Sequence, residues 1–306
     1  MFSEPEPIIA VNIWWLRVAW VTLPITAGWA VAEAVASWST PTRVVAAVLL
    51  WAMWGVVLVA VLAPHPLSLT AVRTAAPLAL VVVILVVVSG RASTVAEVVA
   101  VMGALTCAVI GGSPEIGITC AQGSAYGDEE RFPLAVPPAL FLGVLPLAVL
   151  AVGTGLAAGP LLLAAGAWAA GITAILVGLP LAALALRPLH QLSRRWLVLV
   201  PAGVVVHDPM TLTDPYLFTR EHIAGLGPAD PATRPPERAL DLRLGAARGS
   251  LALLLDQETD VQRRSRNRGV GVRTNLLLVA PVASRRVLAR AEARRISVRH
   301  RARKRA

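Results

Sequence analysis

Residues 161–200 read LLLAAGAWAAGITAILVGLPLAALALRPLHQLSRRWLVLV, and the change of pattern inside this stretch predicts the fold. Up to Leu186 the chain stays apolar for longer than the roughly 20 residues that a helix needs to cross a bilayer. Arg187, Arg194 and Arg195 follow at once, and the short β-rich run WLVLV comes directly after them. We therefore expect a membrane-spanning part followed by a β-rich part.

The composition of the 306 residues supports this division. The chain is 56% hydrophobic and only 15% charged, whereas a soluble domain carries about 25% charged residues. The net charge of +10 is the balance of −3 over residues 1–186 and +13 over residues 187–306. A single soluble globular domain is excluded, and two cysteines exclude both a disulfide scaffold and a four-cysteine zinc site.

The apolar part predicts an α-helical polytopic membrane domain over residues 1–187, with about six crossings. The expected spans are residues 18–38, 44–62, 69–88, 95–111, 138–156 and 161–186. Glycine and proline blur the ends of the fourth and fifth spans, although helices in lipid tolerate such residues. The arginines after the sixth span place the following chain in the cytosol by the positive-inside rule, and six crossings then put both termini there.

Residues 112–137 form the only long loop that the sequence predicts in the membrane part. Turn-forming residues and a local charge cluster mark it as a candidate functional loop, since long ordered loops often carry function. Its candidate residues are Ser124, Tyr126, Asp128, Glu129 and Arg131. One interpretation is that this loop docks on the basic C-terminal module. The other is a solvated connector, which is what most charge runs are.

The chain after residue 187 predicts a β-rich cytosolic domain over residues 188–298. Short apolar or alternating runs separated by turn residues indicate six strands, at residues 195–200, 204–207, 216–218, 239–244, 251–256 and 275–279. Residues 257–273 are polar and basic, and we expect them to be mobile. An amphipathic helix is expected from Ser284, and residues 299–306 are too polar to fold, so they predict a basic disordered tail.

This order of antiparallel strands and a terminal amphipathic helix resembles the bacterial pleckstrin-homology-like (PH-like) domain over residues 194–298. The likeness is carried by RWLVLVPAGVVVHD and VASRRVLARAEARR. The whole chain is similar to a group of actinobacterial multi-pass membrane proteins, through YGDEERFPL and RRWLVLVPAGVVVHDPMTLTDPYLF. The resemblance implies a bent antiparallel sheet closed by the helix, and a bacterial plasma membrane as the location. It implies no particular activity.

Motifs for catalysis or cofactor binding are not found in the sequence. It contains no HExxH, no phosphate-binding GxxxxGK[ST] and no GxSxG, and its five histidines are not at metal-ligand spacing. We therefore expect no cofactor and no metal.

The basic C-terminal residues are candidates for contact with anionic lipid, with a solubilising tail as the alternative. They are Arg263, Arg264, Arg266, Arg268, Arg299, Arg301, Arg303, Lys304 and Arg305. Their attachment to a membrane part and the lack of interleaved aromatic residues favour lipid over nucleic acid.

Three functional hypotheses follow from these patterns. The first is a non-enzymatic integral membrane protein whose cytosolic β module acts as a scaffold or regulator, binding a protein partner or anionic lipid of the inner leaflet. The alternative is a component of a transporter for a small apolar or lipid substrate. The second alternative is a membrane enzyme with its site in the loop of residues 113–131.

Overall fold

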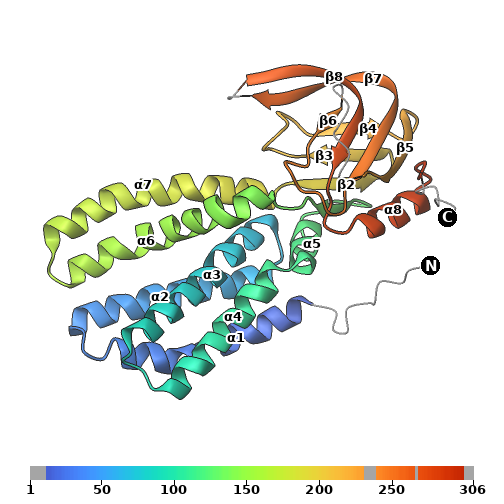
Figure 1. Ribbon diagram of the computed structural model, residues 1–306. Helices are drawn as coiled ribbons and strands as arrows, with labels where there is room; N and C mark the ends of the chain where they lie inside the picture. The colour runs from blue at the N-terminus through green and yellow to red at the C-terminus, as the bar shows by residue number, and fades with distance from the viewer. Residues whose placement is uncertain (1–11, 231–238, 266–267, 300–306) are drawn as a thin grey trace. The chain divides into compact units, whose positions relative to one another are not determined.

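The computed structural model describes residues 12–230, 239–265 and 268–299. The chain forms two compact units (Figure 1). Unit 1 consists of Met1–Cys120 and Leu145–His190, and unit 2 consists of Ala121–Val144 and Gln191–Ala306. Unit 2 is therefore assembled from two pieces of chain that are far apart in the sequence.

Helices lie over all six predicted spans, but several of their ends differ from the prediction. They are α1 (Ile13–Ala34), α2 (Thr40–Leu62), α3 (Pro66–Ser89), α4 (Thr94–Gly112), α5 (Pro114–Gln122), the π-helical turn η1 (Leu140–Val144), α6 (Leu145–Ala164) and α7 (Trp168–Ser193). Five of these, α2, α3, α4, α6 and α7, are long and apolar enough to cross a membrane. Helix α1, which covers most of the first predicted span, is not among these five, because it carries four tryptophans as well as Arg17 and Glu33.

The boundary between the fifth and sixth predicted spans is wrong. The sequence places it between residues 156 and 161, but α6 continues through Pro160 to Ala164. The turn comes at Gly166, whose φ of 82° suits glycine and allows the N–H groups of Gly166 and Ala167 to bond the last carbonyls of the helix. Likewise α7 continues past Pro188 to Ser193, since proline does not end a helix that packs against neighbours.

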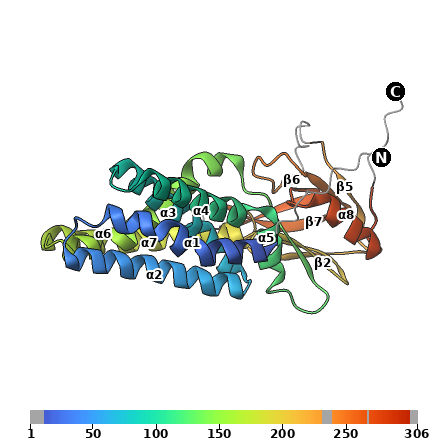
Figure 2. The ribbon, with the colours of Figure 1, turned by 90° about the horizontal axis from the view of Figure 1, so that it is seen from below.

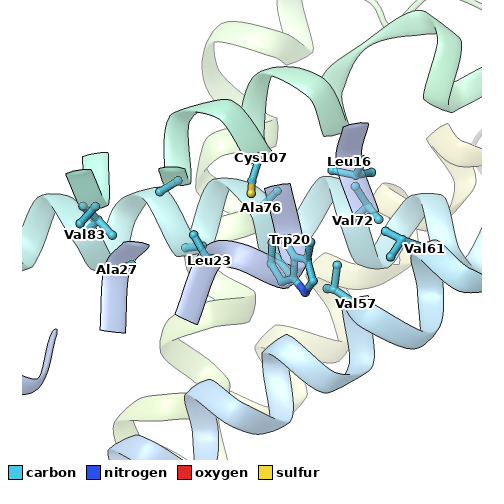
Figure 3. Packing of buried hydrophobic residues seen from close by; sticks show 14 of the residues in the cluster. Leu16, Trp20, Leu23, Ala27, Val57, Val61, Val72, Ala76, Val83 and Cys107 are labelled. Atoms are coloured by element: carbon cyan, nitrogen blue, oxygen red, sulfur yellow. The ribbon is translucent and has the colours of Figure 1, made fainter. Parts of the chain in front are cut away.

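Helices α1 to α4 pack around one apolar cluster. Helix α1 contacts α2, α3 and α4, and Figure 2 shows it between α2 and α4. Trp20 is fully buried in this cluster, where Figure 3 shows it beside Val57. Its indole Nε1 donates to the Trp54 carbonyl at 2.9 Å, and the Trp54 Nε1 donates back to the Trp20 carbonyl at 2.9 Å. Both indole N–H groups are thus satisfied inside the bundle, as an apolar surrounding requires.

The two charged residues of α1 fasten its ends to neighbouring helices. Arg17 Nε donates to the Val61 carbonyl at 2.9 Å, in the last turn of α2. Glu33 Oε2 accepts the backbone N–H of Ser93 at 2.8 Å, directly before α4. A cation at a helix C-terminus and an anion at a helix N-terminus both stabilise the helix dipole. These charges therefore have a structural role in the bundle.

Unit 2 contains two four-stranded sheets and a helix (Figure 1). The first has the order β1 (Glu130–Pro133), β2 (Trp196–Val200), β3 (Gly203–His207), β4 (Tyr216–Thr219), and all its pairs are antiparallel. The second has the order β5 (Ile223–Pro228), β7 (Leu251–Ser265), β8 (Arg268–Val279), β6 (Leu240–Asp241). Helix α8 (Ser284–Ala293) contributes Val287 and Ala291 to the apolar core that both sheets share.

Three predictions for the β-rich part are corrected by these sheets. Residues 257–265 and 268–273, which were expected to be mobile, instead belong to the long antiparallel pair of β7 and β8. Strand β5 was not predicted, because its glycines interrupt the apolar pattern. The expected strand at residues 239–244 is reduced to β6, which runs parallel to β8, because the chain turns at Leu244 and Gly245 with positive φ. The antiparallel β-rich region with its terminal helix is present, and its PH-like character stays a prediction.

The predicted loop at residues 112–137 is only partly a loop. Residues 114–122 form α5, which begins at proline, a favoured first residue of a helix. Residues 130–133 form β1, which pairs with β2 in the register Glu130 to Leu199 and Pro133 to Trp196. The docking interpretation therefore holds for this segment, and the solvated connector is wrong for it.

A prediction concerns the close approach of α6 and α7. A Cβ on Gly155 would collide with the Gly178 carbonyl, and a Cβ on Gly178 would lie 3.0 Å from the Gly155 Cα. Small residues allow such contact between apolar helices. We expect Gly155→Ala to lower the free energy of unfolding by about 1–3 kcal/mol, as overpacking does, measured by thermal unfolding in detergent.

The matched control is Gly55→Ala in α2, where an added Cβ has nothing within 4 Å. It should leave stability unchanged or raise it by up to about 1 kcal/mol through helix propensity. Equal stability of the two variants would contradict the close contact of α6 with α7.

Candidate functional site

A buried ion pair organises the interior of unit 2. The Arg195 guanidinium binds the Asp208 carboxylate through both oxygens, at 2.9 Å from Nε and 2.8 Å from Nη2. The side chains are 1% and 0% exposed. Arg195 also donates to the carbonyls of Ala135 at 3.2 Å and Leu242 at 3.0 Å. These hydrogen bonds compensate both charges for the loss of water, as buried charges require. The pair therefore has a structural role in unit 2.

The predicted functional loop residues form a closed local network. Arg131 donates to Ser124 Oγ at 2.6 Å and to Glu129 Oε2 at 2.9 Å and 3.2 Å. The Tyr126 backbone N–H is 3.4 Å from the same Glu129 oxygen, while the Tyr126 side chain is 86% exposed. The structure thus brings Ser124, Glu129 and Arg131 together, but it neutralises their charges within the loop.

The neighbouring residue Glu130 faces helix α8. Its carboxylate lies 3.2 Å from Arg290 Nε through one oxygen and 3.2 Å from Arg294 Nη2 through the other. Arg294 also donates to the backbone carbonyl of Asp128. The sequence indicated an acidic cluster and a basic helix, but it did not indicate that Glu130 would connect them. No local pattern in the sequence could have shown this contact between residues more than 150 positions apart.

The predicted lipid-contact residues fall into three groups. Arg263, Arg264 and Arg268 are exposed near the turn of the β7–β8 hairpin. Arg299 lies apart from them, because its backbone N–H bonds the Leu226 carbonyl of β5 at 2.8 Å. The remaining predicted positions lie outside the described residues, and they are Arg266, Arg301, Arg303, Lys304 and Arg305.

The turn end of the hairpin has an apolar residue that sequence reasoning missed. The β7–β8 register pairs Arg263 with Val270 and Ser265 with Arg268, so these four side chains share one face. Val270 is 49% exposed on that face. Alternation of residues along two adjacent strands was the signal that could have placed it there.

The outer face of the first sheet carries an aromatic stack. Trp196 stacks on His207 with ring centroids 5.2 Å apart, and the Arg131 guanidinium lies 5.1 Å from the Trp196 ring centre. Burial lowers the pKa of His207, and the positive charges of Arg194 and Arg131 lower it further against the opposing effect of Asp208. His207 is therefore held neutral in the folded protein at neutral pH.

The residues named by the enzyme hypothesis are not all gathered around the hollow beside α8. That hypothesis expects Glu115, Asp128, Glu129 and a histidine around one pocket. An open hollow beside α8 includes Asp128 and Glu130, but its lining has no histidine and neither Glu115 nor Glu129. Within the described ranges, no three His, Cys, Asp or Glu side chains are grouped to hold a metal ion.

A prediction concerns the buried ion pair. Asp208→Asn leaves the Arg195 charge buried without its counter-charge, and we expect it to cost about 3–5 kcal/mol of stability. Thermal unfolding of the full-length protein in detergent, with hydrogen exchange at the β1–β3 amides, measures this loss. The control is Asp241→Asn, which removes the partner of Arg243 but at a carboxylate that is 34% exposed. It should cost less than Asp208→Asn, because the Asp241 carboxylate is already partly solvated although Arg243 is only 8% exposed. Equal losses would show that burial of the carboxylate does not decide the strength of these pairs.

A further prediction concerns pH. The folded state holds His207 neutral below its ordinary pKa of 6.5, while the unfolded chain takes up the proton there. The unfolded state then binds more protons, so stability falls as pH drops below that value, by at most about 1.4 kcal/mol per pH unit. His207→Phe keeps an aromatic ring beside Trp196 and should flatten the profile between about pH 7 and 5.

Comparisons with models of known protein families, with curated proteins and with solved structures each found no match. The function is therefore inferred from the chemistry of the two charged surfaces of unit 2. One is the turn end of the hairpin, and the other is the hollow beside α8.

Proposed function

We propose that this chain is a non-enzymatic integral membrane protein whose C-terminal β-rich unit is a scaffold or regulator on the cytosolic side. In this proposal the β7–β8 hairpin binds the anionic surface of the inner leaflet. The observation that carries the proposal is the group of exposed arginines around an exposed valine at the end of the hairpin.

The length and composition of the helices support the membrane part of the proposal. Five helices are long and apolar enough to cross a bilayer. We infer that α1 is a sixth crossing, because Arg17 and Glu33 bind opposite ends of the neighbouring helices. These residues are sixteen positions apart, which is about 24 Å along a helix. That spacing suits two charged residues near the two faces of a hydrocarbon core about 30 Å thick.

The arginines after α7 support a cytosolic β-rich unit. Arg187 and Arg194 are exposed and free of an ion pair with any described residue. Arg195 is paired with Asp208 and adds no net charge to this region. By the positive-inside rule, two exposed arginines beside the last crossing favour the cytosolic side for the unit that follows.

The distribution of charge along the hairpin supports lipid binding. The acidic residues Asp256, Glu258 and Asp260 lie farther from the turn of the hairpin than Arg263, Arg264 and Arg268 do. Each cation close to an anionic bilayer contributes about 1 kcal/mol. The exposed Val270 between Arg263 and Arg268 can enter the headgroup layer while the guanidinium groups bind phosphates.

The transport alternative has less support. The interior of the α1–α4 bundle is filled by apolar side chains. The buried polar side chains of this bundle, Ser68, Thr70 and Thr74, each donate to a backbone carbonyl of the same region. A carrier for a substrate needs groups or space in its interior that are not already occupied in this way.

The hairpin proposal predicts a lipid-dependent environment at Val270. We expect Val270→Cys, labelled with an environment-sensitive fluorophore in the full-length protein, to shift to shorter emission wavelength in nanodiscs containing phosphatidylglycerol but not in phosphatidylcholine alone. Salt near 1 M should reverse the shift, because the Debye length falls to about 3 Å. The two native cysteines are buried, and unlabelled positions are checked with the wild-type protein.

Two variants complete this test. Arg263→Glu with Arg268→Glu should remove the shift, and Leu217→Cys, at an exposed residue of β4, should show no dependence on lipid charge. Identical spectra of the Val270 label in neutral and anionic nanodiscs would overturn the proposal. The proposal would also be overturned if added RNA shifted the emission of the Val270 label and anionic lipid did not.

A further inference from the structure

Helix α8 ends beside an open hollow of about 450 Å³ in unit 2. The hollow lies between the segment that leads into β1, the turn between β2 and β3, and the last turn of α8. Its charged lining consists of Arg220, Arg290, Arg294, Arg295, Asp128 and Glu130. Four arginines and two acidic residues thus line the hollow, and their formal charges leave an excess of positive charge.

The four arginines are not equally engaged. Arg294 is held by Glu130 at 3.2 Å and by the Asp128 carbonyl. Arg290 contacts only the other oxygen of Glu130, at 3.2 Å, and is 53% exposed. Arg220 and Arg295 are exposed and form no ion pair with any residue that the structure describes. Two free guanidinium groups and one weakly held one therefore remain to bind an anion.

The backbone at Arg295 has a conformation that is uncommon for an arginine. Arg295 has a φ of 59°, in the left-handed region that disfavours side chains. It occupies the position after the helix cap, where its N–H bonds the Glu292 carbonyl at 2.9 Å and the N–H of Ile296 bonds the Ala291 carbonyl at 3.0 Å. Glycine is the usual residue there. Arg295 thus ends the helix in a conformation that residues other than glycine adopt less often, and its position there lies beside the hollow.

The helix dipole alone does not explain this arrangement. A cation in the last turn of a helix is favourable, which accounts for Arg290 and Arg294. It gives no reason to place a third cation at the one position where glycine fits best, nor to bring Arg220 from another part of the chain to the same hollow. These two residues separate a binding site from an ordinary basic helix end.

We propose that this hollow binds a phosphate group, from a soluble phosphorylated molecule or from a phosphomonoester lipid headgroup. Arginine forks match phosphate oxygens with paired hydrogen bonds. Arg220 and Arg295 hold the phosphate, and Arg290 turns to it from Glu130. The Glu130 carboxylate occupies part of the site in the free protein and competes with the ligand. This site shares no residue with the hairpin, so either proposal can fail without the other.

The test measures binding of inorganic pyrophosphate to the full-length protein in phosphatidylcholine nanodiscs by calorimetry. We expect saturable binding that becomes about tenfold weaker in Arg295→Gly and in Arg220→Gln, because each loses a charged pair of hydrogen bonds. Glu130→Gln should bind several-fold more tightly, because the competing carboxylate is gone. Arg295→Gly keeps the fold, since glycine suits the local backbone, and thermal unfolding checks this.

The matched controls are Arg286→Gln, at an exposed arginine of the same helix outside the hollow, and Glu129→Gln, at the carboxylate next to Glu130. Neither should change the affinity more than twofold. A second arm uses nanodiscs that contain phosphatidic acid, and follows hydrogen exchange at residues 290–296. Protection in that arm assigns the phosphate to a lipid headgroup, and pyrophosphate binding without such protection assigns it to a soluble molecule.

Two results would overturn the proposal. One is the absence of both pyrophosphate binding and protection by phosphatidic acid. The other is binding that Arg286→Gln weakens as much as Arg295→Gly does, since that result describes a general attraction to a basic surface. A weaker complex in Glu130→Gln would also contradict the competing role of this carboxylate.

Discussion

The buried pair of Arg195 and Asp208 is the constraint on which unit 2 depends. Two charges removed from water are tolerated only when each is almost fully hydrogen-bonded. Here the bonds come from Asp208 and from the carbonyls of Ala135 and Leu242, which belong to three different segments. The position of one arginine therefore fixes the end of β3, the chain after β1 and the chain after β6. The strand register on both sides of Arg195 follows from this arrangement.

The sequence predicted the parts of the fold that local patterns determine. The second, third and fourth spans agree with α2, α3 and α4 to within four residues, because long apolar runs end there at proline, glycine or serine. The errors arise where a contact with residues far away in the sequence determines the end of a helix or the formation of a strand. Gly159 and Pro160 predict a turn locally, but α6 continues past them because Gly159 packs closely against Ile175 of α7. Residues 257–265 have no buried face of their own except at Val261, yet β8 makes them a strand.

The candidate sites were less predictable than the fold, because they depend on contacts between residues that are far apart in the sequence. The basic C-terminal part could be recognised from its charge, and three of its arginines do lie together at the hairpin turn. The hollow beside α8 depends on Glu130 and Arg220, whose approach to the helix follows from strand pairing. A one-residue difference also separates Glu129, which Arg131 neutralises locally, from Glu130, which faces α8. Glu129 lies directly before β1, whereas Glu130 is the first residue of the strand and is positioned by its pairing with Leu199 of β2.

The pairing of charges narrows where an anionic partner can bind. Of the arginines behind the charge of +13 after residue 186, Arg195 and Arg243 are held by carboxylates of their own domain. The hairpin turn keeps its arginines exposed, so its attraction to an anion is a long-range effect that salt screens. The hollow differs, because one of its arginines, Arg290, is already paired with Glu130, and a ligand that binds Arg290 replaces this carboxylate. The guanidinium group of Arg290 is paired with an anion both before and after this exchange. The affinity for the ligand therefore depends less on salt and more on the geometry of the site. The two surfaces are therefore suited to different tasks: the hairpin to an extended anionic layer, and the hollow to a single compact anion.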